Sequence, residues 1–293
     1  MISFLIPTYN CNATQLVTAL SDQASALQIP YEIRLYDDAS TQPCPENESL
    51  ASLPNVIFRK MENNLGRTAL RNKLAQDAAY EWLLFLDSDV LPLYDTMVET
   101  FVHHIQSDLD LIFGGIAYEE TQPEPERRLR WKYGKCRESR SVPVREEIPY
   151  LSIISGCFLI RKEVFLAANN KLENLYGLDV LFTTRLKEMN VRVKHIDNPV
   201  VHLGLETNED FIRKTESGLQ TLHKLTEEGL IESDFRPIQK MYKRISRWGL
   251  KGIVCWFLGM NRNYYLRKST SADPSLFCFD LYRLHYYCRQ KSS

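Results

Sequence analysis

Several features that would mark out a protein class are missing from this sequence of 293 residues. Its seven cysteines are scattered and form no Cys-x-x-Cys pair, so they indicate neither a zinc knuckle nor a disulfide framework. The longest apolar run, residues 252–260, is far shorter than the roughly 20 residues that span a membrane. The first residues carry no basic segment or cleavage site, which predicts that there is no signal peptide. These absences favour a reducing, cytoplasmic location.

Acidic side chains are missing from one part of the chain. The net charge of −1 speaks against a nucleic-acid binder, yet residues 236–272 contain nine Lys or Arg and no acid. The remaining residues carry 27 basic and all 37 acidic side chains, a balance of −10. Such an asymmetry predicts that one region contacts an anionic surface while another carries out chemistry.

Short apolar runs alternate with amphipathic stretches through the first half of the chain. This alternation predicts an α/β fold with a mostly parallel central sheet flanked by helices. Ligands of such sheets bind beyond the carboxyl ends of the strands. The predicted strands are residues 2–6, 31–36, 56–60, 82–86 and 109–114, and the predicted helices are 14–27, 68–79 and 94–107.

Residues 119–148 interrupt this pattern. The segment begins acidic and Pro-bearing, and seven Lys or Arg residues follow up to Arg140. It predicts a long, mobile excursion outside the core. Strand character returns at 151–161, a helix is predicted at 179–189, a strand-like run follows at 191–196, and residues 200–204 are a short terminal segment.

Acidic pairs follow two of the predicted strands. Asp87 and Asp89, separated by Ser88, can both face a divalent cation and a polyphosphate, since hard oxygen ligands suit Mg²⁺ or Mn²⁺. A solvated turn is an equally good interpretation of these residues taken alone. Asp37 and Asp38 can accept hydrogen bonds from a nucleotide base and ribose. They can as well form an Asx turn or cap a helix.

Four motifs occur in an ordered set: SFLIPTYN at residues 3–10, DDAST at 37–41, NLG at 64–66 with RN at 71–72, and FLDSD at 85–89. Together they resemble the family 2 glycosyltransferases. SGCFLIR at 155–161 resembles that family's acceptor-side strand, YGLDV at 176–180 its Gly-Glu-Asp motif, and VHLG at 201–204 its terminal His segment. The resemblance covers roughly residues 1–205 and implies the nucleotide-binding fold called GT-A.

The resemblance implies a nucleotide site and a metal site. Asp38 would read the uracil edge, and Arg71 would lie near the diphosphate or the base. Asp89 would bind Mn²⁺ or Mg²⁺ directly and His202 would complete the metal shell, although a lone histidine before glycine is more often structural. The nucleotide-binding set as a whole is Pro7, Tyr9, Asn10, Asp37, Asp38, Arg71, Asp87 and Ser88.

Asp179 would be the general base under the same resemblance. It would take the proton of an acceptor hydroxyl while that oxygen displaces the diphosphate in a single inverting step. Considered alone, Asp179 is a helix N-cap, and the two roles can coexist. By the resemblance, Gly156 and Leu178 would mark the acceptor side. Leu178 stands where the family usually carries Glu, which leaves the placement of the acceptor open.

Residues 206–293 form a predicted helical C-terminal extension to the catalytic domain at 1–205. Apolar residues recur near helical spacing from Ile238 to Met260, with cations between them, as in a basic amphipathic helix that suits an anionic membrane surface. Alternatively this helix packs on the catalytic domain and its charges are solvated. No nucleic-acid motif accompanies the charge.

The resemblance therefore predicts a hexosyltransferase-type enzyme. It would move a hexose or N-acetylhexosamine from a UDP-sugar to a saccharide or lipid-linked acceptor during surface polysaccharide or glycolipid assembly, with the protein on the inner face of the membrane. One alternative is a nucleotidyltransferase, but the first strand is followed by no Gly-rich basic phosphate loop. The other is an inactive sugar-nucleotide-binding protein, which Leu178 suggests.

Overall fold

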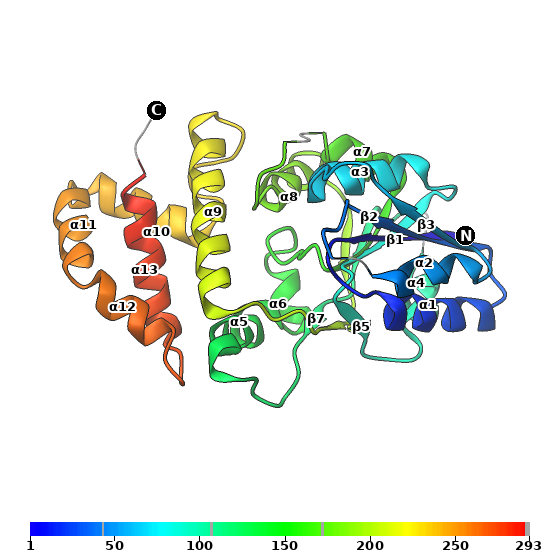
Figure 1. The fold of residues 1–293 in the computed structure, drawn as a ribbon. Coiled ribbons are helices and arrows are strands. Elements are labelled where there is room, and N and C mark those ends of the chain that lie inside the picture. Colours follow the sequence, from blue (N-terminus) through cyan, green and yellow to red (C-terminus); the bar gives the residue numbers. More distant parts are fainter. Residues whose placement is uncertain (43, 106–107, 171–172, 291–293) are drawn as a thin grey trace. The chain divides into compact units, whose positions relative to one another are not determined.

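A computed structural model describes residues 1–42, 44–105, 108–170 and 173–290 (Figure 1). The chain divides into two compact units. The first unit comprises residues 1–119, 138–174 and 185–204, and the second comprises 120–137, 175–184 and 205–293. The predicted domain boundary at 205 lies where the last of these segments begins, and two internal segments join the second unit as well.

A seven-stranded sheet in the order β3-β2-β1-β4-β8-β6-β9 forms the first unit. β8 runs antiparallel to β4 and β6, and the other neighbours are parallel, which confirms the predicted mostly parallel α/β sheet. A three-stranded sheet has the order β5-β10-β7. The strands are β1 (Ile2–Thr8), β2 (Tyr31–Asp37), β3 (Val56–Lys60), β4 (Trp82–Leu86), β5 (Val90–Pro92), β6 (Leu111–Phe113), β7 (Ile116–Ala117), β8 (Cys157–Arg161), β9 (Val193–His195) and β10 (Val200–His202).

The central strands are buried along their length. Residues 4–6 of β1 and 83–86 of β4 are 0% exposed, because a strand that is apolar at consecutive positions is covered on both faces. Figure 1 shows α3 and α7 on one face of the sheet and α1 and α4 on the other. The helices of this unit are α1 (Thr14–Ala26), α2 (Pro45–Ser49), η1 (Leu50–Ser52), α3 (Arg67–Asp77), α4 (Met97–His103), α6 (Val142–Glu146) and α7 (Lys162–Ala168). Residues 106–107 of the predicted helix 94–107 lie outside the described residues.

Residues 119–148 are largely helical, so the prediction of a mobile excursion is wrong. They contain η2 (Pro125–Arg127), α5 (Arg128–Tyr133), the π-helical turn η3 (Gly134–Glu138) and α6. Leu129 is completely buried, and the Arg145 guanidinium donates hydrogen bonds to the carbonyl oxygens of Phe113 and Ile196. These partners are distant in sequence, and the polar composition of the segment gives no sign of them.

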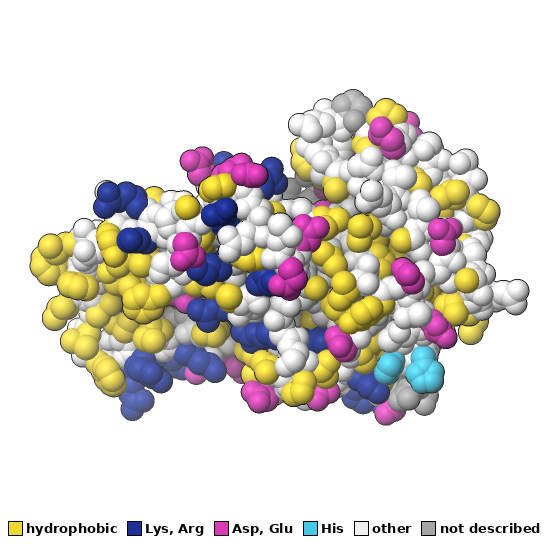
Figure 2. Space-filling view, turned by 90° about the horizontal axis from the view of Figure 1, so that it is seen from below, with side chains coloured by type: hydrophobic (Ala, Val, Ile, Leu, Met, Phe, Trp, Pro, Cys, Tyr) yellow, Lys and Arg dark blue, Asp and Glu magenta, His cyan; other side chains and the backbone are white. Residues whose placement is uncertain are grey.

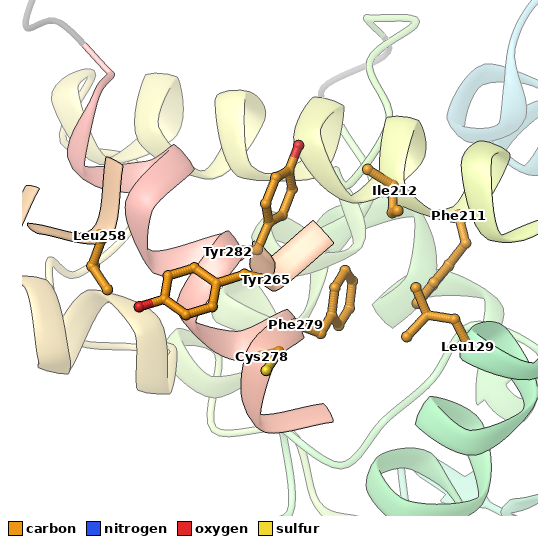
Figure 3. Close-up of a cluster of buried hydrophobic side chains, with 8 residues drawn as sticks. All are labelled: Leu129, Phe211, Ile212, Leu258, Tyr265, Cys278, Phe279 and Tyr282. Atoms are coloured by element: carbon orange, nitrogen blue, oxygen red, sulfur yellow. The ribbon is translucent and has the colours of Figure 1, made fainter. Parts of the chain in front are cut away.

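Helices build the second unit. Side chains from α5, α9, α11, α12 and α13 form one buried apolar cluster (Figure 3). The predicted helical extension is confirmed, but residues 238–260 form two helices, because Gly249 has φ +70° and α10 ends before it. The helices are α9 (Asn208–Glu227), α10 (Pro237–Arg247), α11 (Lys251–Met260), α12 (Arg262–Ser269) and α13 (Leu276–Cys288), and α8 (Asp179–Glu188) starts in this unit. None of the helices within the described ranges has the length and apolar character to cross a membrane.

Candidate functional site

The first unit gathers polar side chains where β1, β2 and β4 end. The parallel register places Thr8 opposite Asp37 and β1 beside β4, so these carboxyl ends share one edge of the sheet. Asp37 accepts a hydrogen bond from the backbone N–H of Ser40 at 2.6 Å, which turns the chain after β2. Asp37 and Asp38 are each only 4% exposed. The edge predicted to bind a nucleotide is thus lined by buried carboxylates.

The Asp38 carboxylate holds the loop that precedes α3. One oxygen accepts the backbone N–H of Leu65 at 2.7 Å and the other accepts that of Gly66 at 2.9 Å. Gly66 has φ +81°, and a Cβ there would lie 2.3 Å from the side-chain oxygen of Asn174, so this loop requires glycine. Asp38 therefore has a structural role, and its contact with a uracil edge stays a prediction.

Asn10 joins the loop after β1 to the loop after β2. Its backbone N–H donates to the Ser40 hydroxyl at 2.8 Å, and its side-chain oxygen accepts the N–H of Gln42 at 2.9 Å. The thiol of Cys11 donates to the carbonyl oxygen of Ser88 at 3.5 Å. The loop after β1 consequently contacts the loops that follow both neighbouring strands.

Asp87 lies between two arginines of α3. Its carboxylate oxygens are 2.5 Å from Nη2 of Arg67 and 2.6 Å from Nη2 of Arg71. The same two arginines donate to Ser155, Arg67 to its hydroxyl at 3.1 Å and Arg71 to its carbonyl oxygen at 2.6 Å. Burial acts to raise the pKa of Asp87, but the two guanidinium charges outweigh it and hold that pKa below its ordinary value. Asp87 is therefore an ionised carboxylate.

Arg67 is a site residue that the sequence interpretation missed. It lies four residues before Arg71, so both side chains leave the same face of α3, and this spacing was the available signal. The side chain of Arg67 is 51% exposed, whereas that of Arg71 is 9% exposed. Arg67 is thus the more accessible of the two cations to a phosphate group entering from solvent.

Asp89 and His202 meet across the small sheet. The antiparallel pairing of β10 with β5 puts His202 opposite Val90, and the N–H of Leu203 donates to the carbonyl oxygen of Asp89 at 2.9 Å. Nε2 of His202 lies 3.5 Å from Oδ2 of Asp89. Burial raises the pKa of the Asp89 carboxyl, while the nearby imidazole opposes this shift and the charge of Asp87 adds to it.

The pair Asp89 and His202 has the donor atoms of a metal site. A carboxylate oxygen and an imidazole nitrogen suit Mn²⁺, and a carboxylate with phosphate oxygens and water suits Mg²⁺. Nδ1 of His202 is buried and has no hydrogen-bond partner within the described ranges. No group of three His, Cys, Asp or Glu side chains placed to hold a metal occurs in the described part of the chain. Two protein ligands would therefore leave positions for a bound nucleotide and water.

Two glycines lie against these carboxylates. A Cβ on Gly204 would be 1.9 Å from Oδ2 of Asp89, so a side chain there would displace the carboxylate. The carbonyl oxygen of Gly156 accepts the N–H of Asp87 at 3.1 Å. A Cβ on Gly156 would lie 3.7 Å from Oδ2 of Asp87. The predicted acceptor-side residue Gly156 is thus adjacent to Asp87, and Gly204 was missed.

Asp179 lies in the second unit, as the first residue of α8, and its side chain is exposed. The turn before it contacts α9: Gly177 has φ +90°, and a Cβ on it would lie 3.1 Å from Cα of Gly218. Leu178 is 6% exposed. The residue in place of the family's usual glutamate therefore contributes to packing, while the catalytic role of Asp179 stays a prediction.

The remaining predicted residues also lie at the β1 and β4 ends. The Tyr9 side chain is 47% exposed, so its ring is accessible to a planar base, and Pro7 before it is half-buried. Ser88 is half-buried between the two aspartates. The first unit thus brings together the predicted nucleotide and metal residues, since all of them lie within it.

This mostly parallel sheet, with acidic and basic side chains at its strand ends, defines an α/β nucleotide-binding fold of the GT-A kind. Residues 3–167, more than half of the chain, match glycosyl transferase family 2. The chain belongs to this family.

One curated relative shares part of the sequence. Over 91 residues the chain is 34% identical to an uncharacterized glycosyltransferase of Haemophilus influenzae (strain ATCC 51907 / DSM 11121 / KW20 / Rd). This stretch covers 30% of the chain and 29% of the relative, so the match spans less than a third of either protein.

Solved structures share the fold. The chain is similar to a mannosyltransferase of Pyrobaculum calidifontis in complex with GDP-Man and Mn²⁺, with TM-score 0.59, 15% identity and coverage of 98% of this chain and 85% of that one. It is similar to TarS 1–349 of S. aureus in complex with UDP-GlcNAc, with TM-score 0.51, 18% identity and coverage of 96% and 89%. A third is glucosyl-3-phosphoglycerate synthase of Mycobacterium tuberculosis in complex with Mn²⁺, UDP and glucosyl-3-phosphoglycerate, with TM-score 0.52, 16% identity and coverage of 80% and 81%. At these identities the likeness is one of fold.

Proposed function

We propose that this chain is a glycosyltransferase that moves a hexose or N-acetylhexosamine from a UDP-sugar to a saccharide or lipid-linked acceptor, in the assembly of a surface polysaccharide or glycolipid. Membership of glycosyl transferase family 2 supports the reaction class. The observation that carries the proposal is the approach of Asp89 to His202 beside an arginine-bound Asp87, at the carboxyl ends of the sheet strands.

A uridine nucleotide is the proposed donor. Two of the similar structures hold UDP or UDP-GlcNAc, and the third holds GDP-Man. The carboxylates of Asp37 and Asp38 retain lone pairs that can accept the ring N–H of uracil and the hydroxyls of ribose. The exposed ring of Tyr9 offers a stacking surface for the base.

Asp89 and His202 would hold Mn²⁺ or Mg²⁺, through a carboxylate oxygen and Nε2. The bound cation would supply positive charge to the diphosphate leaving group. Arg67 and Arg71 would contribute to the same charge balance from α3, because the guanidinium fork matches the geometry of phosphate as well as that of carboxylate.

Asp179 would act on the acceptor. Its carboxylate would accept the proton of the acceptor hydroxyl as that oxygen bonds to the anomeric carbon and the carbon–oxygen bond to the diphosphate breaks. One displacement inverts the anomeric centre, and no covalent enzyme intermediate is needed. Since Leu178 is buried, other groups would orient the acceptor hydroxyl.

A cytoplasmic position on the inner face of a membrane belongs to this proposal, because a lipid-linked acceptor is presented at a membrane surface. The basic composition of residues 236–272 supports it.

Calorimetric titration of UDP, with and without Mn²⁺, tests the donor site. Asp89→Ala is expected to abolish the metal-dependent part of UDP affinity, and Gly204→Ala to weaken it by about 10- to 100-fold, as for a residue that supports a metal ligand. Asp95→Ala, at an exposed position, and Gly252→Ala, where a Cβ meets nothing within 4 Å, are the matched controls.

The outcomes separate the parts of the proposal. If UDP affinity does not depend on the metal and is unchanged in Asp89→Ala, the proposed metal site is wrong. If GDP or CDP binds more tightly than UDP, the proposed donor nucleotide changes but the proposed reaction class stays the same. Binding of UDP-sugars without transfer or hydrolysis would identify an inactive sugar-nucleotide-binding protein, the alternative that Leu178 raises.

A further inference from the structure

The second unit exposes large apolar side chains around α11. Trp248, Ile253, Trp256, Phe257 and Met260 are 68%, 65%, 67%, 56% and 66% exposed. Figure 2 shows hydrophobic side chains gathered over the C-terminal helices, with Lys and Arg around them. Exposed apolar patches of this kind mark binding surfaces, since water solvates them poorly.

α11 is held in place from its other side. Leu258 is 4% exposed and belongs to the buried cluster with Tyr265 and Phe279, and Val254 packs against that cluster. The inward side chains thus fix the helix while Trp256 and Phe257 point away from the core. The exposure of these aromatic residues is therefore a property of the folded unit.

The charge of residues 236–272 has one sign, although Lys243 forms an ion pair with Asp234 just outside this segment. Six cations at exposed positions accompany the apolar residues, and no acid occurs from 236 to 272. These cations are Lys240, Lys243, Arg244, Arg247, Arg267 and Lys268. We call the five apolar residues and six cations the basic aromatic face. Two copies of this face would repel each other, so its charge favours an anionic partner over a second copy of the chain.

A shallow depression, largely open to solvent, lies beside the exposed side chains. It measures about 590 Å³, and Lys251, Trp256, Met260, His285 and Arg289 are among the residues that line it. Aromatic and thioether groups next to cations match a ligand with an apolar chain and an anionic head. This is the chemistry of an anionic phospholipid.

We propose that the basic aromatic face docks on the surface of an anionic lipid bilayer. Trp256, Phe257 and their apolar neighbours would enter the boundary between headgroups and acyl chains, and the cations would contact the phosphate groups. Tryptophan suits this depth because its ring is apolar while its N–H can still donate to a headgroup. Docking is independent of glycosyl transfer and would hold the chain where lipid-linked molecules lie.

Co-sedimentation of the full chain with vesicles tests this surface. Vesicles of phosphatidylcholine with phosphatidylglycerol are expected to bind the chain, less so at high salt, and vesicles of phosphatidylcholine alone to bind it weakly. Replacing Trp256→Ser together with Phe257→Ser should weaken binding by at least about tenfold, because two large apolar side chains no longer enter the bilayer. Leu93→Ser with Tyr94→Ser, at exposed positions of the first unit, is the matched control.

A second double variant tests the contribution of the cations to vesicle binding. Arg244→Gln with Arg247→Gln should lower affinity for the anionic vesicles roughly thirtyfold, from about 1 kcal/mol for each cation. Arg213→Gln with Lys224→Gln, on α9, should leave it unchanged. Every variant should keep its circular dichroism and its UDP affinity, so that misfolding or a lost donor site is recognised separately.

The proposal is overturned if the wild-type chain does not sediment with the anionic vesicles. It is also overturned if the Trp256→Ser, Phe257→Ser double variant and the Leu93→Ser, Tyr94→Ser control bind these vesicles with equal affinity. Retention on immobilised polyglutamate without vesicle binding would instead assign the face to an acidic protein. The wild-type chain could instead form a concentration-dependent dimer that is lost in the Trp256→Ser, Phe257→Ser double variant, with no binding to vesicles. That result would assign the basic aromatic face to a second copy of the chain.

Discussion

The two units place their large apolar side chains in opposite environments. In the first unit, the strands β1 and β4 bury every residue from 4 to 6 and from 83 to 86, and polar chemistry begins where each strand ends. In the second unit, α11 buries Leu258 and leaves Trp256 and Phe257 exposed. A buried sheet fixes the position of a few polar groups, whereas a half-buried helix presents a surface. The first arrangement suits a small ligand and the second suits an extended partner.

The largest expected effect tests whether the second unit takes part in the chemistry. Asp179→Asn removes a proton acceptor, so turnover should fall by about 10²–10⁴-fold while UDP affinity stays unchanged. Initial rates with a UDP-sugar and a transferring acceptor, together with calorimetry, measure both. Glu209→Gln, an exposed acid in the first turn of α9, is the control. Full turnover in Asp179→Asn would confine the chemistry to the first unit.

The next effect compares two neighbours on α11. Leu258→Ala should lower the free energy of unfolding by about 2–5 kcal/mol, since it leaves a cavity in the cluster with Tyr265 and Phe279. Trp256→Ala should change it by no more than about 0.5 kcal/mol, as for an exposed position. Urea unfolding measures both. Equal decreases in the free energy of unfolding for the two variants would show that Trp256 stabilises the fold and would weaken the contrast between the units.

The last expected effect is a pH dependence of stability that belongs to the first unit. Burial, reinforced by the charge of Arg145, lowers the pKa of His195 to about 4 from its ordinary 6.5. The unfolded chain therefore binds this proton first as the pH falls. Stability should decrease between pH 6.5 and about 4, by on the order of 3 kcal/mol.

His195→Gln should flatten that slope in urea unfolding at a series of pH values. His103→Gln, at an exposed position in α4, should keep the wild-type slope. The same slope in wild type and His195→Gln would mean that other groups in the sheet unit govern its acid sensitivity.

Much of the first unit could be predicted because its signals are local. Each buried strand is an unbroken apolar run, and each acidic pair follows one, so order and spacing were enough to place Asp37 and Asp87 at the strand ends. The contacts that hold the carboxylates of this site in position are not local, because they join residues far apart in the sequence. Asp38 binds the N–H groups of a loop 27 and 28 residues away, and Gly204 is required by a carboxylate far back in the chain.

The second unit was less predictable for a related reason. Amphipathic periodicity showed that residues 238–260 are helical, but it did not show that Gly249 divides them or which side is covered. Leu129 enters the apolar cluster from a segment whose composition is charged. A single buried leucine among arginines gives too weak a pattern to identify a helix that packs against partners about 80 and 150 residues later in the chain.

The arginine-bound aspartate has a consequence for the order in which ligands are held. Counted as ionised groups, Arg67, Arg71, Asp87 and Asp89 sum to zero, so by themselves they give a diphosphate little electrostatic reason to stay. A divalent cation at the proposed site of Asp89 and His202 would change that sum to +2, and the nucleotide would in turn supply the oxygens that two protein ligands leave missing. Each ligand would therefore raise the affinity for the other by the same factor, as thermodynamic linkage requires. At the proposed site, cation and nucleotide should therefore behave as heterotropic partners, each binding more tightly when the other is present.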